Sequence, residues 1–184
     1  TGNTYPSVNT AINNQAETGA LLINFTGHGN ENFWTHEHVL NSTMVQHWTN
    51  LNNLPLFYSS TSEISRYDSP DIITLNEHIL LNPNGGGIAA IGASRLTYST
   101  PNFVQNQKFI NYLFTRKNLT GEYLSLGEIF KHSKNTTGTS INKRTTSLLG
   151  DPALKLAYPK FEVTTNYINN EPINLFNDTL FAGD

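Results

Sequence analysis

The sequence predicts an α/β fold in which helices cover both faces of a mainly parallel sheet. Three continuous apolar runs have the length of buried strands, and they span Ala20–Phe25, Leu54–Ser59 and Ile88–Ile91. Segments with helical spacing separate these runs, and that alternation is typical of parallel sheets. The 184 residues suffice for one domain of ordinary size and a short further piece.

Each predicted helix has its own signal in the sequence. Pro6 opens a helix with apolar residues at every fourth position, and the helix ends near Gly19. A second stripe of four-residue spacing lies between the first two strands, at Leu40, Met44 and Trp48. Three further helices are predicted at Thr74–Leu81, Phe103–Thr115 and Leu126–Lys134.

The pattern changes towards the C-terminus. Asp151-Pro152 predicts a turn that enters the last strand of the domain, Leu154–Leu156. After Pro159 the residues alternate like a half-exposed strand and no helical segment follows. We therefore expect a main domain over residues 1–159 and the start of a β-type module over residues 160–184.

Composition excludes several classes of function. A net charge of -3 without a basic cluster argues against a nucleic-acid partner. No apolar run approaches the roughly 20 residues that span a bilayer. The chain has no cysteine, so neither disulfides nor thiol chemistry are available to it as written. It also lacks a start methionine and a signal peptide, so we expect a fragment or a processed product.

Candidate catalytic groups follow two of the predicted strands. His28, between two glycines, follows the first strand, and Ser62 follows the second. Functional groups of parallel sheets gather beyond the carboxyl ends of strands, and a histidine facing a nucleophile is the minimum arrangement for acyl transfer. The backbone N–H of Gly29 is then a candidate oxyanion donor. An equally weighted alternative makes the Gly-His-Gly segment a tight turn and Ser62 a polar cap.

Other polar residues near these strand ends have two interpretations each. Glu63 lines a substrate pocket or orients His28, or equally it acts as a cap or pairs with Arg66. Arg95 follows the third strand and is a candidate substrate-binding residue, although structural pairing is favoured. Asp68 lies with Arg66 in a predicted turn, where an ion pair or an Asx-turn is the default. His36 and His38 do not have the spacing of a metal site, so no metal ligands are predicted.

Four segments resemble, in order, the motifs of the gingipain-type cysteine peptidases of the caspase-like clan. LLINFTGHGNENFW resembles the histidine motif, and LPLFYSSTSEISRYDSP resembles the nucleophile motif, where a Thr-Cys-Glu-Phe-Ser-Arg-Tyr-Asp run is usual. GGGIAAIGASRLTYSTPN and SLLGDPALKLAYP resemble the segments that follow. The resemblance covers Tyr5 to Pro159 and is greatest to the signal peptidases, or sortases, of the type IX secretion system of Bacteroidetes.

The resemblance implies a caspase-like three-layer α/β/α fold whose N-terminal strands are missing here, followed by a β-sandwich-like (Ig-like) module. His28 is then the general base, residue 62 the nucleophile, and the N–H groups of Gly29 and residue 62 the oxyanion donors. The implied activity is removal of the C-terminal secretion signal from exported proteins at the bacterial cell surface, in association with the outer membrane. The implied partners are those substrates, a surface glycolipid acceptor and other secretion-system components. No cofactor is required, and structural calcium is the one metal implied.

Ser62 departs from this pattern, because the family has a cysteine there. A cysteine thiol has a pKa of about 8.5, whereas an alcohol is not ionised at neutral pH. No G-x-S-x-G elbow surrounds Ser62, so a serine hydrolase is not indicated either. We therefore expect an inactive peptidase. Deliberate replacement of the cysteine is the favoured origin, and the alternative is a natural paralogue that binds secretion signals or cargo without cleavage.

Overall fold

The computed structural model describes residues 5–117, 119–159, 161, 164–168 and 171–175. At its centre is a four-stranded sheet whose spatial order is β1-β4-β5-β6. Its strands are β1 (Leu22–Thr26), β4 (Leu56–Ser60), β5 (Ala89–Ala93) and β6 (Thr146–Leu149). The first three run parallel and β6 runs antiparallel to β5. The prediction of an α/β fold with a mainly parallel sheet is therefore confirmed.

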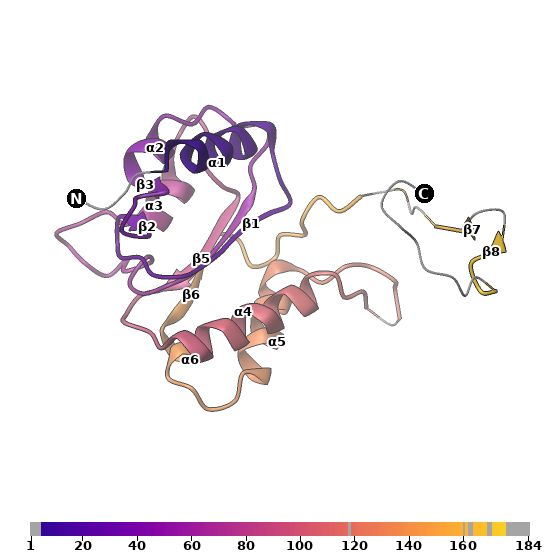
Figure 1. Ribbon diagram of the computed structural model, residues 1–184. Coiled ribbons are helices and arrows are strands. Elements are labelled where there is room, and N and C mark those ends of the chain that lie inside the picture. Colours follow the sequence, from indigo (N-terminus) through magenta and orange to yellow (C-terminus); the bar gives the residue numbers. More distant parts are fainter. Residues whose placement is uncertain (1–4, 118, 160, 162–163, 169–170, 176–184) are drawn as a thin grey trace.

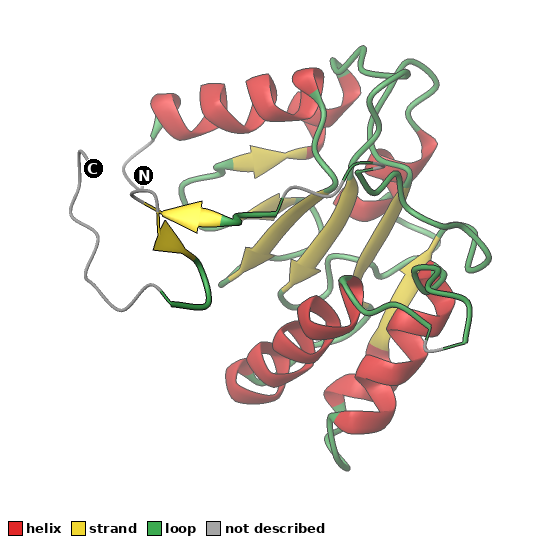
Figure 2. Cartoon of the chain, turned by 90° about the vertical axis from the view of Figure 1, so that its right-hand side faces the viewer, coloured by secondary structure: helices red, strands yellow, loops and turns green. Residues whose placement is uncertain are grey.

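Helices cover the sheet on both faces (Figures 1 and 2). One layer holds α1 (Pro6–Thr18), α2 (Ser42–Gln46) and α3 (Leu75–Leu81), and the other holds α4 (Ser99–Leu113), α5 (Leu126–Thr136) and α6 (Asn142–Thr145). Capping boxes begin α3 and α5, where the Glu77 and Glu128 carboxylates accept the N–H groups of Thr74 and Ser125 at 2.9 and 2.8 Å. The architecture has the three layers that the resemblance implies.

The two central strands divide their side chains between two cores. Phe57 of β4 packs with Trp34 and Trp48 under the first helical layer. Its neighbours Leu56 and Tyr58 pack with Phe109 under the second layer. All of these side chains are buried, because successive residues of a strand face opposite sides of the sheet and helices cover both sides. The continuous apolar run in the sequence reflects this double burial.

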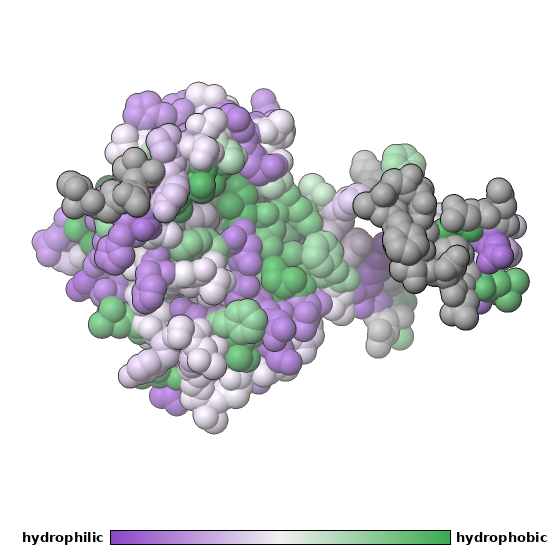
Figure 3. Space-filling view, viewed as in Figure 1, coloured by the Kyte–Doolittle hydropathy of each residue, from purple (hydrophilic) through white to green (hydrophobic). Residues whose placement is uncertain are grey.

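The first strand departs from its prediction. Ala20–Phe25 was expected to be a fully buried strand, but β1 lies at the edge of the sheet within the described residues, and its side chains are half-buried or exposed. Figure 3 shows apolar atoms between the two helical layers on the side where Figure 1 places β1. An apolar run predicts that a strand contacts a core, but it does not determine whether the strand lies inside the sheet or at its edge.

Two further predictions about local structure are wrong. Leu154–Leu156 is not a strand; the last strand of the sheet is β6, which precedes the Asp151-Pro152 turn. Leu156 is nevertheless buried in the second core, so packing and not strand pairing explains its apolar character. The stripe from Leu40 to Trp48 is not one helix either, since α2 spans only Ser42–Gln46 and Leu40 lies in β3 (Leu40–Asn41), paired with β2 (Phe33–Trp34).

Little of the predicted β module falls within the described residues. Strands β7 (Tyr167–Ile168) and β8 (Glu171–Pro172) form an antiparallel pair that lies apart from the sheet in Figure 1. The rest of 160–184 lies mostly outside the described residues, so the boundary near Pro159 stays a prediction. No helix in the described part of the chain is long and apolar enough to cross a membrane.

Candidate active site

The register of β1 and β4 brings the two candidate catalytic residues to one edge of the sheet. Thr26 lies opposite Ser60 at the carboxyl ends of these strands. His28 and Ser62 each follow two residues later, so both emerge at the same end. They line one cleft of about 140 Å³, together with Gly29 and Thr97. The structure thus brings His28 and Ser62 to one cleft, and their catalytic roles stay a prediction.

Ser62 is held by a residue that the sequence analysis did not single out. The Ser62 Oγ accepts a hydrogen bond from the Thr97 N–H at 3.0 Å and shares a second with the Thr97 hydroxyl at 3.2 Å. The Asn102 side chain donates to the same Thr97 hydroxyl at 2.7 Å. Asn102 in turn accepts from Asn142 Nδ2 at 2.9 Å. The hydroxyl at position 62 is therefore at the end of a chain of hydrogen bonds that reaches α6.

The backbone on both sides of the cleft has unusual requirements. A Cβ on Gly29 would lie 2.7 Å from the Phe33 carbonyl oxygen and 3.0 Å from the Thr61 hydroxyl, so only glycine fits. Glu63, directly after Ser62, has φ of 56°, in the left-handed region that non-glycine residues rarely occupy. Its N–H donates to the Arg95 carbonyl at 3.2 Å. This sharp turn ends β4 and presents Ser62 to the cleft.

Among the residues that line the cleft, the backbone N–H groups of Gly29 and Ser62 are without an acceptor in the described part of the chain. Gly29 pairs with Trp34 in an antiparallel bridge, whose hydrogen bonds run from Asn30 N–H to Phe33 and from Thr35 N–H to His28. In such a pair the Gly29 N–H points away from the Trp34 side. Free N–H groups beside a nucleophile have the chemistry of an oxyanion hole.

The His28 ring is exposed and has no hydrogen-bond or ion-pair partner in the described part of the chain. Only its backbone is fixed, since its carbonyl accepts the Thr35 N–H at 2.8 Å. The described residues therefore supply a dyad at most, and no third group that would orient the imidazole.

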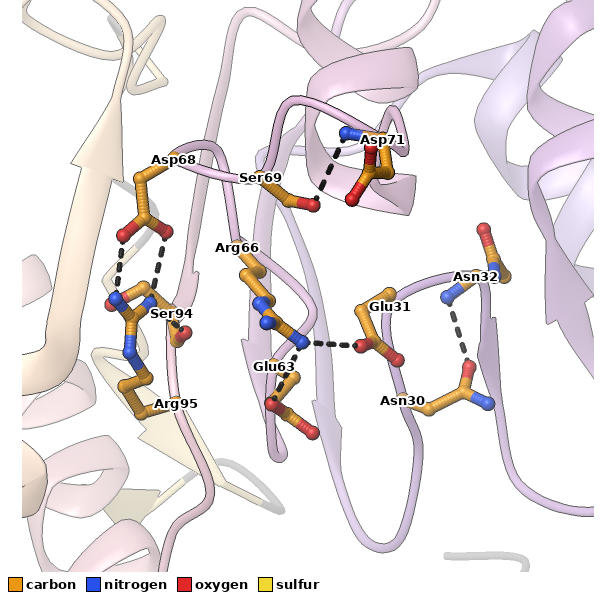
Figure 4. Close-up of polar contacts among 10 residues, drawn as sticks. All are labelled: Asn30, Glu31, Asn32, Glu63, Arg66, Asp68, Ser69, Asp71, Ser94 and Arg95. Carbon is orange, nitrogen blue, oxygen red and sulfur yellow. Dashed lines mark hydrogen bonds and ion pairs between the residues drawn. The ribbon is translucent and has the colours of Figure 1, made fainter.

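The charged residues beside the cleft pair with one another (Figure 4). Arg66 lies 3.3 Å from Glu31 and 3.5 Å from Glu63. Arg95 donates two hydrogen bonds to Asp68, at 2.9 and 2.5 Å. Those hydrogen bonds lower the pKa of Asp68 to about 2.

These contacts bear on the two predicted substrate-binding residues. Neither Glu63 nor Arg95 is among the residues that line the cleft. Glu63 has Arg66 as its ion-pair partner, one of its expected alternatives, and Arg95 has the structural pairing that was favoured for it, with Asp68. Their role in substrate binding stays a prediction. In the described ranges no group of three His, Cys, Asp or Glu side chains is placed to hold a metal ion.

Comparison with known proteins gives the context of this cleft. Residues 1–157 match the family described as Peptidase family C25. No curated protein matches the sequence. Among solved structures, the complex of Porphyromonas gingivalis RgpB pro- and mature domains has 19% identity and a TM-score of 0.71, and the two are similar over 85% of this chain and 38% of that one.

A crystal structure of the Arg-specific cysteine proteinase gingipain R (RGPB) is similar to 85% of this chain, with 37% of that chain covered, 20% identity and a TM-score of 0.70. A structure titled only as a protease covers 77% of this chain, with 36% of its own length, 18% identity and a TM-score of 0.65. The chain thus spans well under half the length of these structures, and at such identities they establish the fold. With the family match over residues 1–157, the chain belongs to peptidase family C25, the gingipain-type cysteine peptidases.

Proposed function

We propose that this chain carries the dyad of a gingipain-type endopeptidase and that Ser62 silences it. The observation that carries the proposal is the single cleft shared by His28, Gly29 and Ser62. A thiol at position 62 would lose its proton to His28 and attack the substrate carbonyl carbon as a thiolate. The N–H groups of Gly29 and residue 62, which have no acceptor among the described residues, suit the oxyanion that this attack creates.

The serine hydroxyl is a poor substitute for that thiol. An alcohol is not ionised near neutral pH and needs a well-oriented base. The Ser62 oxygen already accepts the Thr97 N–H, and His28 has no carboxylate partner in the described residues. We infer that the chain has little or no peptidase activity.

The finer function that we propose comes from the sequence motifs. They resemble those of the type IX signal peptidases, which remove a C-terminal secretion signal from exported proteins and transfer the cargo to a surface glycolipid. On this proposal the partners are those substrates and other secretion components, and the location is the bacterial cell surface at the outer membrane. A structural calcium ion belongs to the same proposal.

The test is to introduce Ser62→Cys with the upstream half of the peptidase domain present, and to assay cleavage of a cargo protein that carries its C-terminal secretion domain. We expect cleavage to appear with Ser62→Cys and to be lost again in Ser62→Cys/His28→Ala, the matched control. Cleavage of cargo without loss of its C-terminal domain would support a peptidase and contradict the signal-removal role.

The second candidate is a paralogue that binds secretion signals without cutting them, and the departure at Ser62 itself favours it. If Ser62→Cys stays inactive while the cargo still binds, this candidate replaces the peptidase. The codon at position 62 of the natural gene distinguishes the two origins of the serine, because a cysteine codon there would indicate deliberate replacement.

A further inference from the structure

A second cavity lies at the edge of the sheet opposite β1 and is separate from the proposed catalytic cleft. It measures about 780 Å³ and lies between helix α5 and the edge of β6. Figure 1 shows β6 as the last strand of the sheet, with α5 and α6 in the layer beside it. None of its lining residues lines the cleft of His28 and Ser62.

One wall of the groove is a stripe along α5. The lining residues of this helix are spaced three and four apart, which places them on one helix face: Gly127, Phe130, Lys131, Lys134 and Asn135. Other residues of the same helix, among them Leu126 and Ile129, face the second core. The helix therefore has one face in the core and a second that faces the groove.

The opposite wall is the outer edge of β6. Along this edge, the backbone N–H and carbonyl of one residue are free, among the described residues, to pair with a further strand. The Ser94 N–H donates to the Thr145 carbonyl, so the neighbouring residues Ala93 and Thr146 are a non-hydrogen-bonded antiparallel pair. The backbone N–H and carbonyl of Thr146 therefore point away from β5, towards the groove. Backbone groups alternate along a strand, so the N–H and carbonyl of Leu148, two residues further on, also point towards the groove. The outward groups of Thr146 are used, its N–H by the Asn142 carbonyl and its carbonyl by Lys134 Nζ at 2.8 Å. The N–H and carbonyl of Leu148 have no partner among the described residues.

The groove is strongly cationic. Four basic residues line it, and no acidic residue does: Lys131, Lys134, Lys143 and Arg144. None of the four forms an ion pair with a carboxylate in the described part of the chain. Burial, and after it the charge of Lys143, lowers the pKa of Lys134, so the site favours a compensating negative charge.

We propose that this groove binds an extended acidic peptide segment, which adds to the sheet as a strand beside β6. The peptide backbone would pair with the N–H and carbonyl of Leu148, as in other cases of strand addition. Its acidic side chains would face Lys131, Lys143 and Arg144 on the side of α5 and α6. The apolar side chains between them would lie on the opposite face of the sheet, the face of Leu149, because its neighbour Leu148 packs against the second core. A peptide with alternating acidic and apolar residues suits this arrangement, because successive side chains of a strand face opposite sides of the sheet.

The test measures binding of a fluorescein-labelled octapeptide of alternating glutamate and valine by fluorescence anisotropy. We expect saturable binding to the chain and a steep loss of affinity between about 0.05 M and about 0.5 M NaCl, because salt screens exposed charges. Lys131→Glu/Arg144→Glu is expected to weaken binding by about tenfold or more. The matched control, Lys108→Glu/Lys155→Glu, makes the same change in net charge outside the groove and is expected to bind as the unaltered chain does.

A second arm tests the backbone pairing without altering the protein. The same octapeptide, N-methylated at every residue, keeps its charges but can donate no backbone hydrogen bond to the Leu148 carbonyl, and we expect about a tenfold loss of affinity. Undiminished binding would mean a simple anion site and overturn the proposal. Equal weakening by the control variant, tighter binding of an oligothymidylate than of the peptide, or a dimer of the chain that excludes the peptide in light scattering would each overturn it too.

Discussion

The hydroxyl of Ser62 is engaged by its neighbours. It accepts the Thr97 N–H and shares a hydrogen bond with the Thr97 hydroxyl, which Asn102 also holds. A hydrogen bond donated to an oxygen nucleophile draws on the lone pair needed for attack. At the scale of single residues, the cleft therefore holds the Ser62 hydroxyl in place by hydrogen bonds to Thr97.

Replacement of the Ser62 oxygen by sulfur, in Ser62→Cys, allows the effect of His28 on the pKa of a thiol at this position to be measured. In Ser62→Cys we expect iodoacetamide to alkylate the thiol with a pH midpoint below the ordinary thiol pKa of about 8.5, because His28 lines the same cleft and would stabilise the thiolate. Intact-mass spectrometry over time measures the rate, and no other cysteine competes, since the chain has none. The control Ser62→Cys/His28→Ala is expected to return the midpoint to about 8.5. An unchanged midpoint would remove His28 from the dyad.

At the scale of elements, the ends of β4 and β5 are joined by an ion pair. Arg95, shortly after β5, holds Asp68 in the segment after β4 with two hydrogen bonds. The backbone of the two segments is also joined, since Ser65 N–H donates to the Ala93 carbonyl at 3.0 Å. These contacts shape the loop beside the cleft.

The pair predicts a pH dependence of stability. Asp68 has a pKa of about 2 in the folded chain, below its ordinary value of 3.8, so the stabilisation is present above pH 3.8 and is lost as pH falls through about 2. We expect Asp68→Asn to lower the melting temperature slightly near neutral pH, and the difference from the unaltered chain to vanish towards pH 2. The effect is small and sensitive to salt, because both side chains are exposed.

Asp71→Asn is the matched control for this experiment. Asp71 lies in the same segment and forms no ion pair with the described residues. Its substitution is expected to leave the pH dependence of the melting temperature unchanged. A melting difference for Asp68→Asn that persists at pH 2 would show that the pair contributes through something other than charge.

The whole molecule depends on a sheet that serves two cores at once. Phe57 belongs to the first core and Phe109, from α4, to the second. Both side chains are fully buried. The second core is joined to the sheet by an edge-on contact between Phe109 and Tyr58, with ring centres 5.0 Å apart. Loss of either core would therefore expose one face of the same strands.

We expect Phe57→Ala and Phe109→Ala each to lower the free energy of unfolding by about 3–5 kcal/mol, the usual cost of emptying a buried aromatic site. Urea titration followed by circular dichroism measures both. Because β4 belongs to both cores, we expect one cooperative transition in each variant. Two separate transitions would show that the helical layers unfold independently. Asn111→Ala, on an exposed position of α4, is the control and should change stability by less than about 0.5 kcal/mol.

Several features of this protein were determined by local sequence alone. The apolar runs of β4 and β5 predicted buried parallel strands, and the helical patterns at Thr74–Leu81 and Leu126–Lys134 predicted α3 and α5, because burial and helical spacing act over a few neighbouring residues. Four ordered motifs were enough to predict the family to which the chain belongs. His28 and Ser62 were predicted to meet because both follow parallel strands.

Tertiary structure alone decided the rest. Strand order put β1 at an edge and made β6, rather than Leu154–Leu156, the last strand, because pairing depends on which segments meet in space. It also brought Thr97 to Ser62, 35 positions away, and set four basic residues of α5 and α6 beside the outer edge of β6. A contact between distant segments leaves no local pattern, so these features appear only when the chain is folded.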